Sequence, residues 1–397
     1  MSFDFEAVIF MKFGKLVVVN ALVLLGLIAV IEAVAQIVIL MRPSYEVLFL
    51  QPDRSLGWKH VPNHKFTWAG HYWYAADFSV PIEINSIGFR DTERSAMKPI
   101  GVRRVALLGD SFIEAIQVPI DMTAARLTQD NLNENQGRGP FNGVNWEVLN
   151  FGTSNYGVGQ YLLAWEEYAS RFSPNYVAVF VAQFHFERTL SKYESGAFKE
   201  TRNEKLWVRP TFRLDNNELV REPARDFDAF LSAQKELIER AFSGERSRIR
   251  REIVVASLAK EFIRRIQVWS AANSRDETVH PSGVPQVSVK SSYVLEEINQ
   301  RLLLKLHEGV KENGGRLVIL DASQYFGNDS SVSDAIESFA VQSGIDYLPV
   351  YRDLLTAEAN GRTTRWRHDG HLNRLGNEIL ADSIAAWIRL EDAEDLR

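Results

Sequence analysis

Short runs of apolar residues alternate with helical patterns along most of the chain after residue 103. Such continuous runs are typical of parallel strands, because helices cover both faces of the sheet. The expected strands are 105–108, 147–151, 176–182, 316–320 and 345–350, and the expected helices are 122–133, 161–170, 294–310, 333–341 and 375–390. This alternation predicts an α/β fold of three layers around a parallel sheet of about five strands, spanning residues 103–392.

Two regions depart from this rhythm. Residues 44–102 are rich in aromatic and turn residues, and we expect a lead-in of short strands there. Residues 191–290 form an expected insertion, with a charged helical part at 227–265 and a part rich in Ser, Gly and Pro at 270–289. The insertion is either a lid over the sheet edge or a solvated excursion without a catalytic role.

Residues 16–41 form an apolar segment whose clearly polar members are Asn20, Glu32 and Gln36. About 20 apolar residues suffice to span a bilayer as a helix, so we expect a transmembrane anchor after a cytoplasmic stub at 1–15. Lys12 and Lys15 precede the segment, which favours a body outside the cytoplasm on an inner membrane, facing the periplasm.

Two other interpretations of this segment stay open. The Ala-Val-Ala sequence at 33–35 resembles a signal-peptide cleavage site, although cleavage there would leave the apolar residues 37–41 near a new terminus. Alternatively, the segment is a buried core helix that carries Glu32 inward.

Composition narrows the possible functions. The net charge of −6 gives no reason to expect a nucleic-acid partner. The chain has no Cys, which excludes disulfides, thiolate zinc sites and a Cys nucleophile. The eight His show no recognisable metal-binding spacing, so no metal or other cofactor is expected.

A candidate nucleophile follows the first expected strand of the sheet. That strand ends in Gly109-Asp110-Ser111-Phe112. Ligands of open α/β sheets bind outside the carboxyl ends of the strands, so Ser111 is expected to face the ligand crevice. A serine needs an adjacent imidazole to take its proton, and a lone Gly-Asp-Ser sequence is weak evidence without one.

A candidate base lies near the C-terminus, in Arg367-His368-Asp369-Gly370-His371-Leu372-Asn373. A single turn can present both Asp369 and His371, so that the carboxylate orients the imidazole and stabilises its protonated form. The competing interpretation of His371 is a surface or helix-capping residue. We therefore expect Ser111, His371 and Asp369 to act as nucleophile, base and orienting acid.

These motifs together resemble a known family. GDSF at 109–112, NFGTSNYGVGQ at 150–160 and HDGHLN at 368–373 are similar to conserved blocks I, II and V of the SGNH (GDSL) hydrolases, in that order. LGW at 56–58 and INSIGFRD at 84–91 resemble the lead-in of bacterial, membrane-tethered members. The resemblance implies a flavodoxin-like sheet, a Ser nucleophile, a His base and an oxyanion hole. It further implies esterase, lipase, deacetylase or O-acyltransferase activity.

The chain departs from the family pattern at three places. Block II aligns Asn155 with the residue whose backbone N–H binds the oxyanion, and Asn tolerates the left-handed backbone best among non-Gly residues. Gly152 remains a candidate for the loop shape. Block III lacks its Asn donor, which Gln183 or His185 is expected to replace. His368 occupies the position where many members carry the Asp, whereas the D-x-H spacing here resembles the alginate-acetyltransferase-like branch.

Two further groups carry competing interpretations. Trp68, Tyr72, Trp73 and Tyr74 are either a sugar-stacking platform or packing residues, and packing is favoured. Arg362, Arg365 and Arg367 either bind an anionic saccharide or lie on a solvated loop.

The sequence as a whole predicts a membrane-anchored serine hydrolase or O-acyltransferase. Its expected substrate is an acylated carbohydrate or other ester of a cell-envelope or exported polysaccharide, and polysaccharide-export proteins are expected partners. The alternative from another class is a weakly active or inactive binding or scaffold protein of such an export system, which keeps the fold without the block III donor.

Overall fold

The computed structural model describes residues 3–41, 50–69, 77–134, 144–190, 193–194, 207–224, 227–228, 231–232, 295–367 and 369–395. The chain divides into two compact units, 1–46 with 244–285, and 47–243 with 286–397. The predicted elements of 227–265 and 270–289 fall almost entirely outside the described residues.

A five-stranded parallel sheet forms the centre of the second unit. Its strand order is β13-β12-β7-β5-β6, and every neighbouring pair is parallel. The bounds are β5 Val102–Leu108, β6 Asn145–Asn150, β7 Tyr176–Val181, β12 Arg316–Asp321 and β13 Asp346–Leu348. The predicted α/β fold class is therefore confirmed, and each strand coincides with an expected apolar run.

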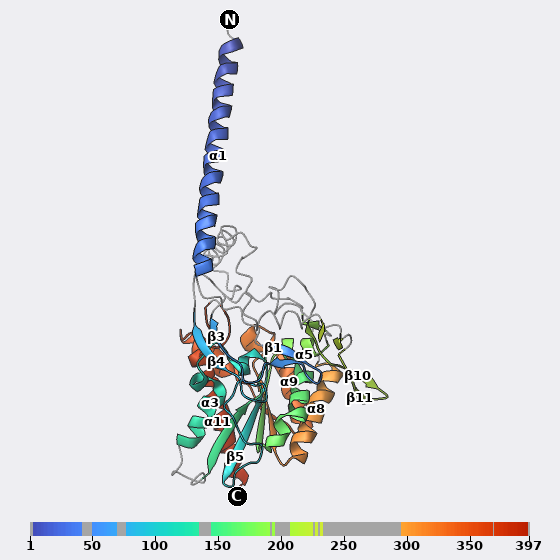
Figure 1. Ribbon diagram of the computed structural model, residues 1–397. Coiled ribbons are helices and arrows are strands. Elements are labelled where there is room, and N and C mark those ends of the chain that lie inside the picture. The colour runs from blue at the N-terminus through green and yellow to red at the C-terminus, as the bar shows by residue number, and fades with distance from the viewer. Residues whose placement is uncertain are drawn as a thin grey trace. The chain divides into compact units, whose positions relative to one another are not determined.

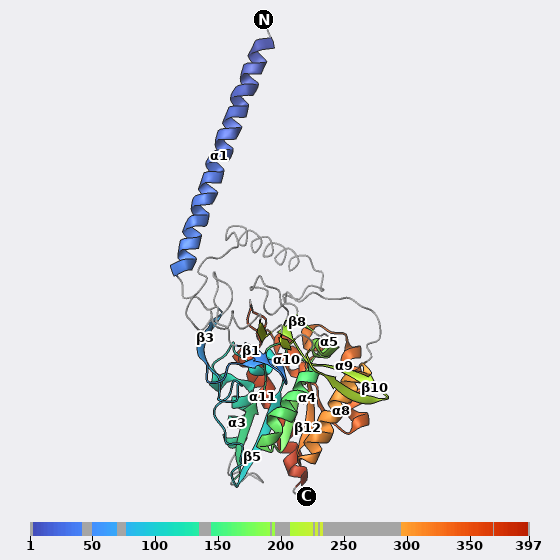
Figure 2. The ribbon, with the colours of Figure 1, turned by 45° about the vertical axis from the view of Figure 1, so that its right-hand side comes forward.

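Alternate residues of the strands pack into two separate cores, one on each face of the sheet. On one face, Ala106, Val179 and Ile319 pack with α4 (Val158–Glu167), α8 (Glu297–Glu312) and α9 (Ser330–Ser343). On the other, Val105, Phe180 and Val318 pack with α3 (Ala124–Glu134), α10 (Tyr351–Ala359) and α11 (Arg374–Asp395). Figures 1 and 2 show the resulting three layers. Because successive side chains of a strand point to opposite faces, a continuous apolar run supplies both cores.

The lead-in contains short strands that pair in two antiparallel hairpins. β1 (Leu50–Asp53) pairs with β2 (Gly57–His60), and β3 (Lys65–Ala69) pairs with β4 (Ser79–Glu83). Trp58 and Phe89 of this region are fully buried in the same core as α4 and α8. The lead-in therefore packs as part of the same core as the sheet and its helices.

The described part of the predicted insertion contains strands that the sequence patterns did not indicate. β8 (Tyr193–Glu194) pairs with β9 (Trp207–Val208), and β10 (Thr211–Asp215) pairs with β11 (Glu218–Glu222). The guanidinium of Arg209 lies over the ring of Trp58, with 5.0 Å between its carbon and the ring centroid. This part of the insertion thus packs on the lead-in.

Helix α1 (Phe3–Met41) belongs to the first unit. Its stretch Lys15–Ile37 is long and apolar enough to cross a membrane, and no other helix of the described residues meets that test. Its large apolar side chains are exposed, for example Leu22 at 62% and Leu25 at 61%, unlike those of a core helix. By length and composition, the segment is a candidate for a single membrane span or a signal sequence.

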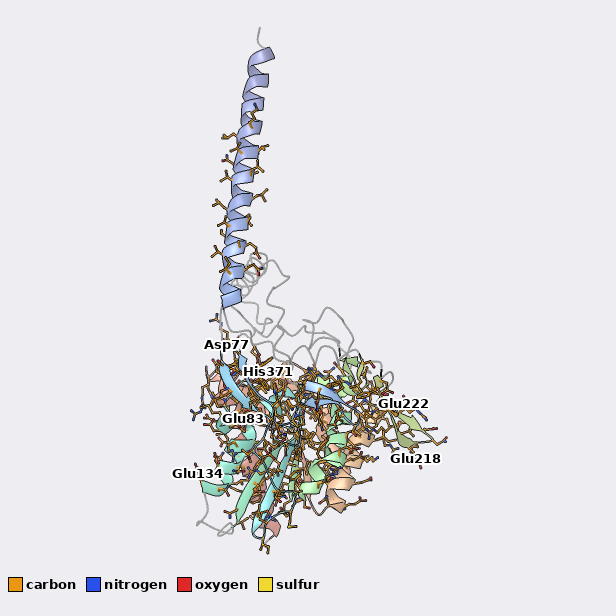
Figure 3. All side chains as sticks on the ribbon, in the orientation of Figure 1. Asp77, Glu83, Glu134, Glu218, Glu222 and His371 are labelled. Carbon is orange, nitrogen blue, oxygen red and sulfur yellow. The ribbon has the colours of Figure 1, made fainter. Side chains whose placement is uncertain are left out.

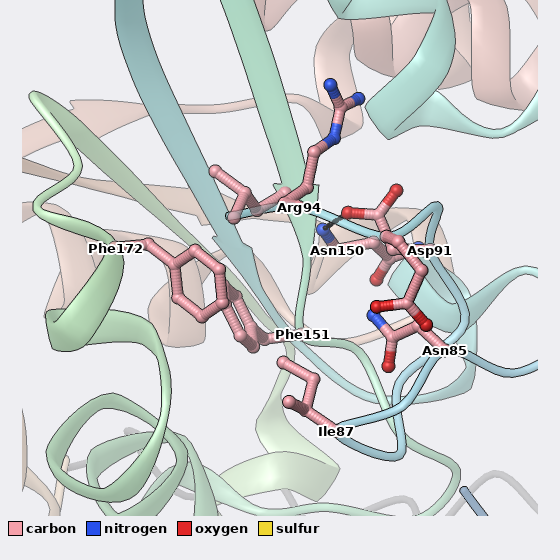
Figure 4. Close-up of a pocket in the computed structure, with 9 residues that line it drawn as sticks. Asn85, Ile87, Asp91, Arg94, Asn150, Phe151 and Phe172 are labelled. Carbon is pink, nitrogen blue, oxygen red and sulfur yellow. Dashed lines mark hydrogen bonds between the residues drawn. The ribbon is translucent and has the colours of Figure 1, made fainter. Parts of the chain in front are cut away.

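A small pocket lies between the lead-in residues 85–94, the carboxyl end of β6 and Phe172. Its volume of about 20 Å³ is room for about one water molecule. Asp91 lines it, and Figure 4 shows the Asp91 carboxylate accepting a hydrogen bond from the Asn150 N–H, at 3.1 Å. Burial raises the pKa of Asp91 to about 6, although hydrogen bonds from Asn150 and Thr92 and the charge of Arg94 oppose the rise.

This raised pKa predicts a pH dependence of stability. Folded Asp91 keeps a proton between about pH 4 and pH 6 that the unfolded chain has released, so the free energy of unfolding falls as pH rises through that window. The fall is on the order of 3 kcal/mol. Asp91→Asn should remove it, as measured by urea unfolding at several pH values. Asp130→Asn, which alters an exposed carboxylate of α3, is the control. An unchanged slope in Asp91→Asn would contradict the assignment.

Candidate active site

The nucleophile candidate lies on a one-turn helix that follows strand β5, which pairs with β6 and with the central strand β7. Helix α2 (Ser111–Glu114) begins at Ser111, and the Asp110 side chain caps it by accepting the Phe112 N–H at 3.0 Å. Ser111 is buried, with 8% of its surface exposed. The predicted position at the carboxyl end of a buried strand is thus the observed one.

The base candidate lies on a loop just before α11. The Trp366 N–H donates to the His371 carbonyl at 2.9 Å, and the Gly370 N–H donates to the Trp366 carbonyl at 3.0 Å. Gly370 has a φ of 85°, which a residue with a side chain rarely adopts. Figure 3 shows that His371 and Asp77 lie at the same end of the unit.

The three predicted residues form a continuous hydrogen-bonded relay. The Asp369 carboxylate lies 2.5 Å from Nδ1 of His371, and Nε2 of His371 lies 2.9 Å from Oγ of Ser111. A carboxylate only accepts hydrogen bonds, so Nδ1 carries the proton and Nε2 is free to accept the Ser111 hydroxyl. Asp369 also accepts the His371 backbone N–H at 3.2 Å, which fixes the turn between them.

The surroundings of His371 make it a stronger base. Burial opposes the charged imidazolium, but the hydrogen bond and negative charge of Asp369 outweigh burial and raise the pKa of His371 above its ordinary value of 6.5. The charges of Asp110 and Glu114 add to this rise. His371 remains 26% exposed at its side chain, which a proton shuttle to substrate requires.

The block II turn lies against the nucleophile helix. Asn155 has a φ of 64°, so it adopts the left-handed conformation that its alignment with a glycine predicts. Within the described part of the chain, the N–H groups of Ser111 and Asn155 donate no hydrogen bond. Gly152 is required for close approach, because a Cβ there would collide with the backbone nitrogen of Glu114.

The two residues expected to replace the block III donor have other partners in the structure. Gln183 begins α5 (Gln183–Leu190), and its amide donates to Glu187 and accepts from Asn328, both at 2.8 Å. His185 is fully buried; its Nδ1 accepts the Ala182 N–H at 2.9 Å, and its Nε2 lies 2.9 Å from Asp110. Burial lowers the pKa of His185, and the ring is therefore neutral and donates to Asp110. Its direct role as an oxyanion donor stays a prediction without a supporting contact.

Asp110 is a buried anchor that the sequence interpretation treated only as part of a motif. Its carboxylate binds Nε2 of His185 and the guanidinium of Arg188, the latter at 2.8 Å. Burial alone would raise its pKa, but these two partners and the Phe112 N–H hold the pKa of Asp110 well below its usual range. Arg188 comes from α5, so α5 supports the nucleophile turn through Asp110 rather than through Gln183.

Aromatic side chains border the relay on one side. The ring centroid of Phe112 lies 4.9 Å from that of His371 and 4.7 Å from that of Phe326. Phe184 lies 5.2 Å from Phe326 in turn. Apolar rings beside the imidazole reduce the access of water to it, which strengthens the electrostatic interactions of the site.

The remaining candidate residues either pack against other side chains or lie outside the described residues. Trp68 packs against the core, in line with the favoured interpretation. Arg365 pairs with Glu358 at 3.3 Å and lies over the Tyr325 ring. Tyr72, Trp73, Tyr74 and His368 lie outside the described residues. Among the described residues no cluster of three potential metal ligands occurs.

Comparison with known proteins gives similarity at the level of solved structures. No family model matches the chain. No curated protein matches it either. One similar structure is TesA, at 12% identity and a TM-score of 0.37, covering 72% of this chain and 98% of TesA. Another is a putative lipolytic protein of the G-D-S-L family from Desulfitobacterium hafniense, at 10% identity and a TM-score of 0.33, covering 71% and 98%. A third is the acetyl xylan esterase AlAXEase, at 11% identity and a TM-score of 0.35, covering 72% and 99%.

The Desulfitobacterium hafniense protein is named for the family that the sequence motifs resemble. The similarity is to folds, so the chemistry of this chain has to be inferred from its own residues.

The relay predicts a specific response to loss of the acid. Asp369→Asn should lower kcat on an activated ester by roughly 10² to 10⁴, because the wrong imidazole tautomer is favoured. The acid limb of the kcat/KM profile should also move to lower pH, since Asp369 is what raises the pKa of His371.

The control is Asp334→Asn, which alters an exposed carboxylate of α9. The decisive measurement is the pH profile of both variants and the unaltered protein. An acid limb that stays in place while kcat falls would show that Asp369 does not set the basicity of His371.

Proposed function

We propose that the chain is a serine hydrolase of the SGNH type that cleaves acyl esters. The single observation that supports this most strongly is the relay from Asp369 through His371 to Ser111, with 2.5 Å and 2.9 Å between the paired atoms. Ser111 lies 260 residues before His371 in the sequence, and a non-catalytic protein has no need to bring this serine onto a basic imidazole.

The geometry supports a two-step mechanism. Oγ of Ser111 attacks the ester carbonyl carbon while its proton passes to Nε2 of His371, and Asp369 stabilises the imidazolium. The N–H groups of Ser111 and Asn155 stabilise the negative oxygen of the tetrahedral intermediate. The intermediate expels the alcohol, which takes the proton from Nε2, and the acyl group stays on Ser111.

The acyl group then passes to an acceptor by the same route in reverse. Water as acceptor gives a hydrolase, whereas a carbohydrate hydroxyl gives an O-acyltransferase. The resemblance to membrane-tethered family members favours an acylated carbohydrate of the cell envelope, with export proteins as partners. The apolar helix α1 supports attachment to a membrane, with the body outside the cytoplasm.

The nucleophile is tested by substitution. Ser111→Ala should abolish cleavage of p-nitrophenyl acetate and labelling by a fluorophosphonate probe, with the melting temperature nearly unchanged. Ser330→Ala, which alters an exposed serine of α9, should retain both activities. Labelling and turnover are measured on the same purified samples. Unlabelled wild-type protein would favour the binding or scaffold alternative instead.

Topology is tested separately from chemistry. A reporter fused after Arg397 should be active only outside the cytoplasm, because the basic flank of α1 favours a cytoplasmic N-terminus. Deletion of residues 1–42 should release the body from the membrane fraction. Cleavage of the N-terminal segment in mature protein, seen by mass spectrometry, would show a signal sequence instead of an anchor.

A further inference from the structure

A second group of buried polar residues centres on Glu114 of helix α2, the helix that begins at Ser111. This group takes no direct part in the mechanism above. Glu114, the last residue of α2, is fully buried. Its two carboxylate oxygens have separate partners: Nε2 of the fully buried His60 and the hydroxyl of Ser154. Glu114 thus connects three distant segments, namely α2, the lead-in strand β2 and the block II turn.

The hydrogen bonds of His60 restrict where its protons lie. Nδ1 of His60 lies 3.2 Å from the Gly88 carbonyl, which only accepts, so Nδ1 carries a hydrogen. Nε2 of His60 then bonds the Glu114 carboxyl group. Both carboxylate oxygens of Glu114 thus have a hydrogen-bond partner in the protein, His60 for one and Ser154 for the other.

Such a pair is a poor source of stability. The desolvation of two buried polar groups offsets most of their attraction, and well-packed apolar residues often stabilise a fold equally well. A buried pair instead fixes a particular geometry, because removing one partner leaves the other unsatisfied. The geometry fixed here is that of the turn next to Ser154.

Ser154 is held at both ends. Its hydroxyl donates to Glu114, and its carbonyl accepts the Trp58 Nε1–H at 3.0 Å. The next residue, Asn155, has a φ of 64°, in the left-handed region that residues with a Cβ adopt rarely. Strained backbone of this kind persists only where the surroundings hold it. Here the hydrogen bonds from Ser154 to Glu114 and from Trp58 to Ser154 stabilise this conformation.

The other end of the nucleophile helix is held from the same lead-in. The buried guanidinium of Arg90 donates to the carbonyls of Glu114, at 3.0 Å, of Ala115, and of Val118, at 2.6 Å. Ala115 is itself left-handed, with a φ of 54°. The lead-in therefore holds both the helix that carries Ser111 and the turn that carries Asn155.

We infer that Glu114, supported by His60, is a positioning residue that sets the Asn155 N–H relative to Ser111 through Ser154. This inference rests on the proposed ester chemistry and deepens it. This positioning function requires Glu114 to accept the Ser154 hydroxyl and to bond His60, and it is separate from the contribution of the Glu114 charge to the pKa of His371. The oxyanion site is then built jointly by block II and the lead-in.

The inference is tested with full-length protein in detergent, using an activated oxoester and the matching thionoester. Sulfur is a weaker hydrogen-bond acceptor than oxygen, so preference for the oxoester reports the quality of the oxyanion site. Ser154→Ala should lower kcat on the oxoester by about 10- to 100-fold, part of the loss expected on removing a donor entirely. KM should change little, and the oxoester preference should fall by a factor similar to that of kcat.

Glu114→Gln supplies the conservative comparison. A glutamine can accept the Ser154 hydroxyl through Oε1 and donate through Nε2 to neutral His60, so every contact is retained. We expect kcat and the oxoester preference to stay within about threefold of wild type. This change is smaller than the fall in kcat that removal of one oxyanion donor causes. Ser333→Ala, which removes a buried hydroxyl from α9 that has no hydrogen-bond partner, controls for the loss of a buried oxygen.

Three outcomes would overturn the inference. In the first, Ser154→Ala keeps the wild-type kcat and oxoester preference. In the second, it slows both esters equally, which indicates a general structural defect. In the third, Glu114→Gln loses as much as Ser154→Ala while folded, which shows that charge is essential. If wild-type protein cleaves neither ester, the proposed function itself is wrong, and the inference falls with it.

Discussion

A helix of four residues cannot hold its own position, and this constraint governs the architecture around Ser111. One turn fixes several backbone dihedrals for very few hydrogen bonds, so its formation is unfavourable without outside contacts. The structure supplies them with buried charged side chains: Asp110 at the start of α2, Glu114 within it and Arg90 at its end. Because each of these residues is satisfied by partners from elsewhere in the chain, the position of the nucleophile depends on the whole unit.

The same residues shape the electrostatics of the site. Asp110 is kept ionised by His185 and Arg188, and its negative charge raises the pKa of His371. Asp369 provides the larger effect through direct contact. In the proposed mechanism, the raised pKa of His371 favours proton transfer from Ser111, and neutral His185 adds no competing positive charge next to the relay. Asp110 and Glu114 thus both hold helix α2 in place and contribute to the raised pKa of His371.

The sequence predicted those features that local patterns encode. Continuous apolar runs identified the five strands, and the structure confirms the parallel sheet, with Ser111 just after the carboxyl end of β5. His371 and Asp369 were predicted because two residues of separation place them on one turn. Gln183 and His185 were predicted as donors without knowledge that α5 begins at Gln183 and directs both side chains elsewhere. His60 and Glu114 carried no signal, since 54 residues separate them and neither belongs to a periodic pattern.

The burial of Trp58, His60 and Arg90 also changes where the catalytic body begins. By strand count, the α/β architecture is complete from β5 onward, and a fragment starting at Val102 would retain the entire sheet. Such a fragment would lose the indole that holds Ser154 and the guanidinium that caps the nucleophile helix. It would also leave the Glu114 carboxylate in an apolar interior without its imidazole. The minimal catalytic fragment therefore extends back to the first hairpin, and the lead-in cannot be exchanged for an unrelated linker.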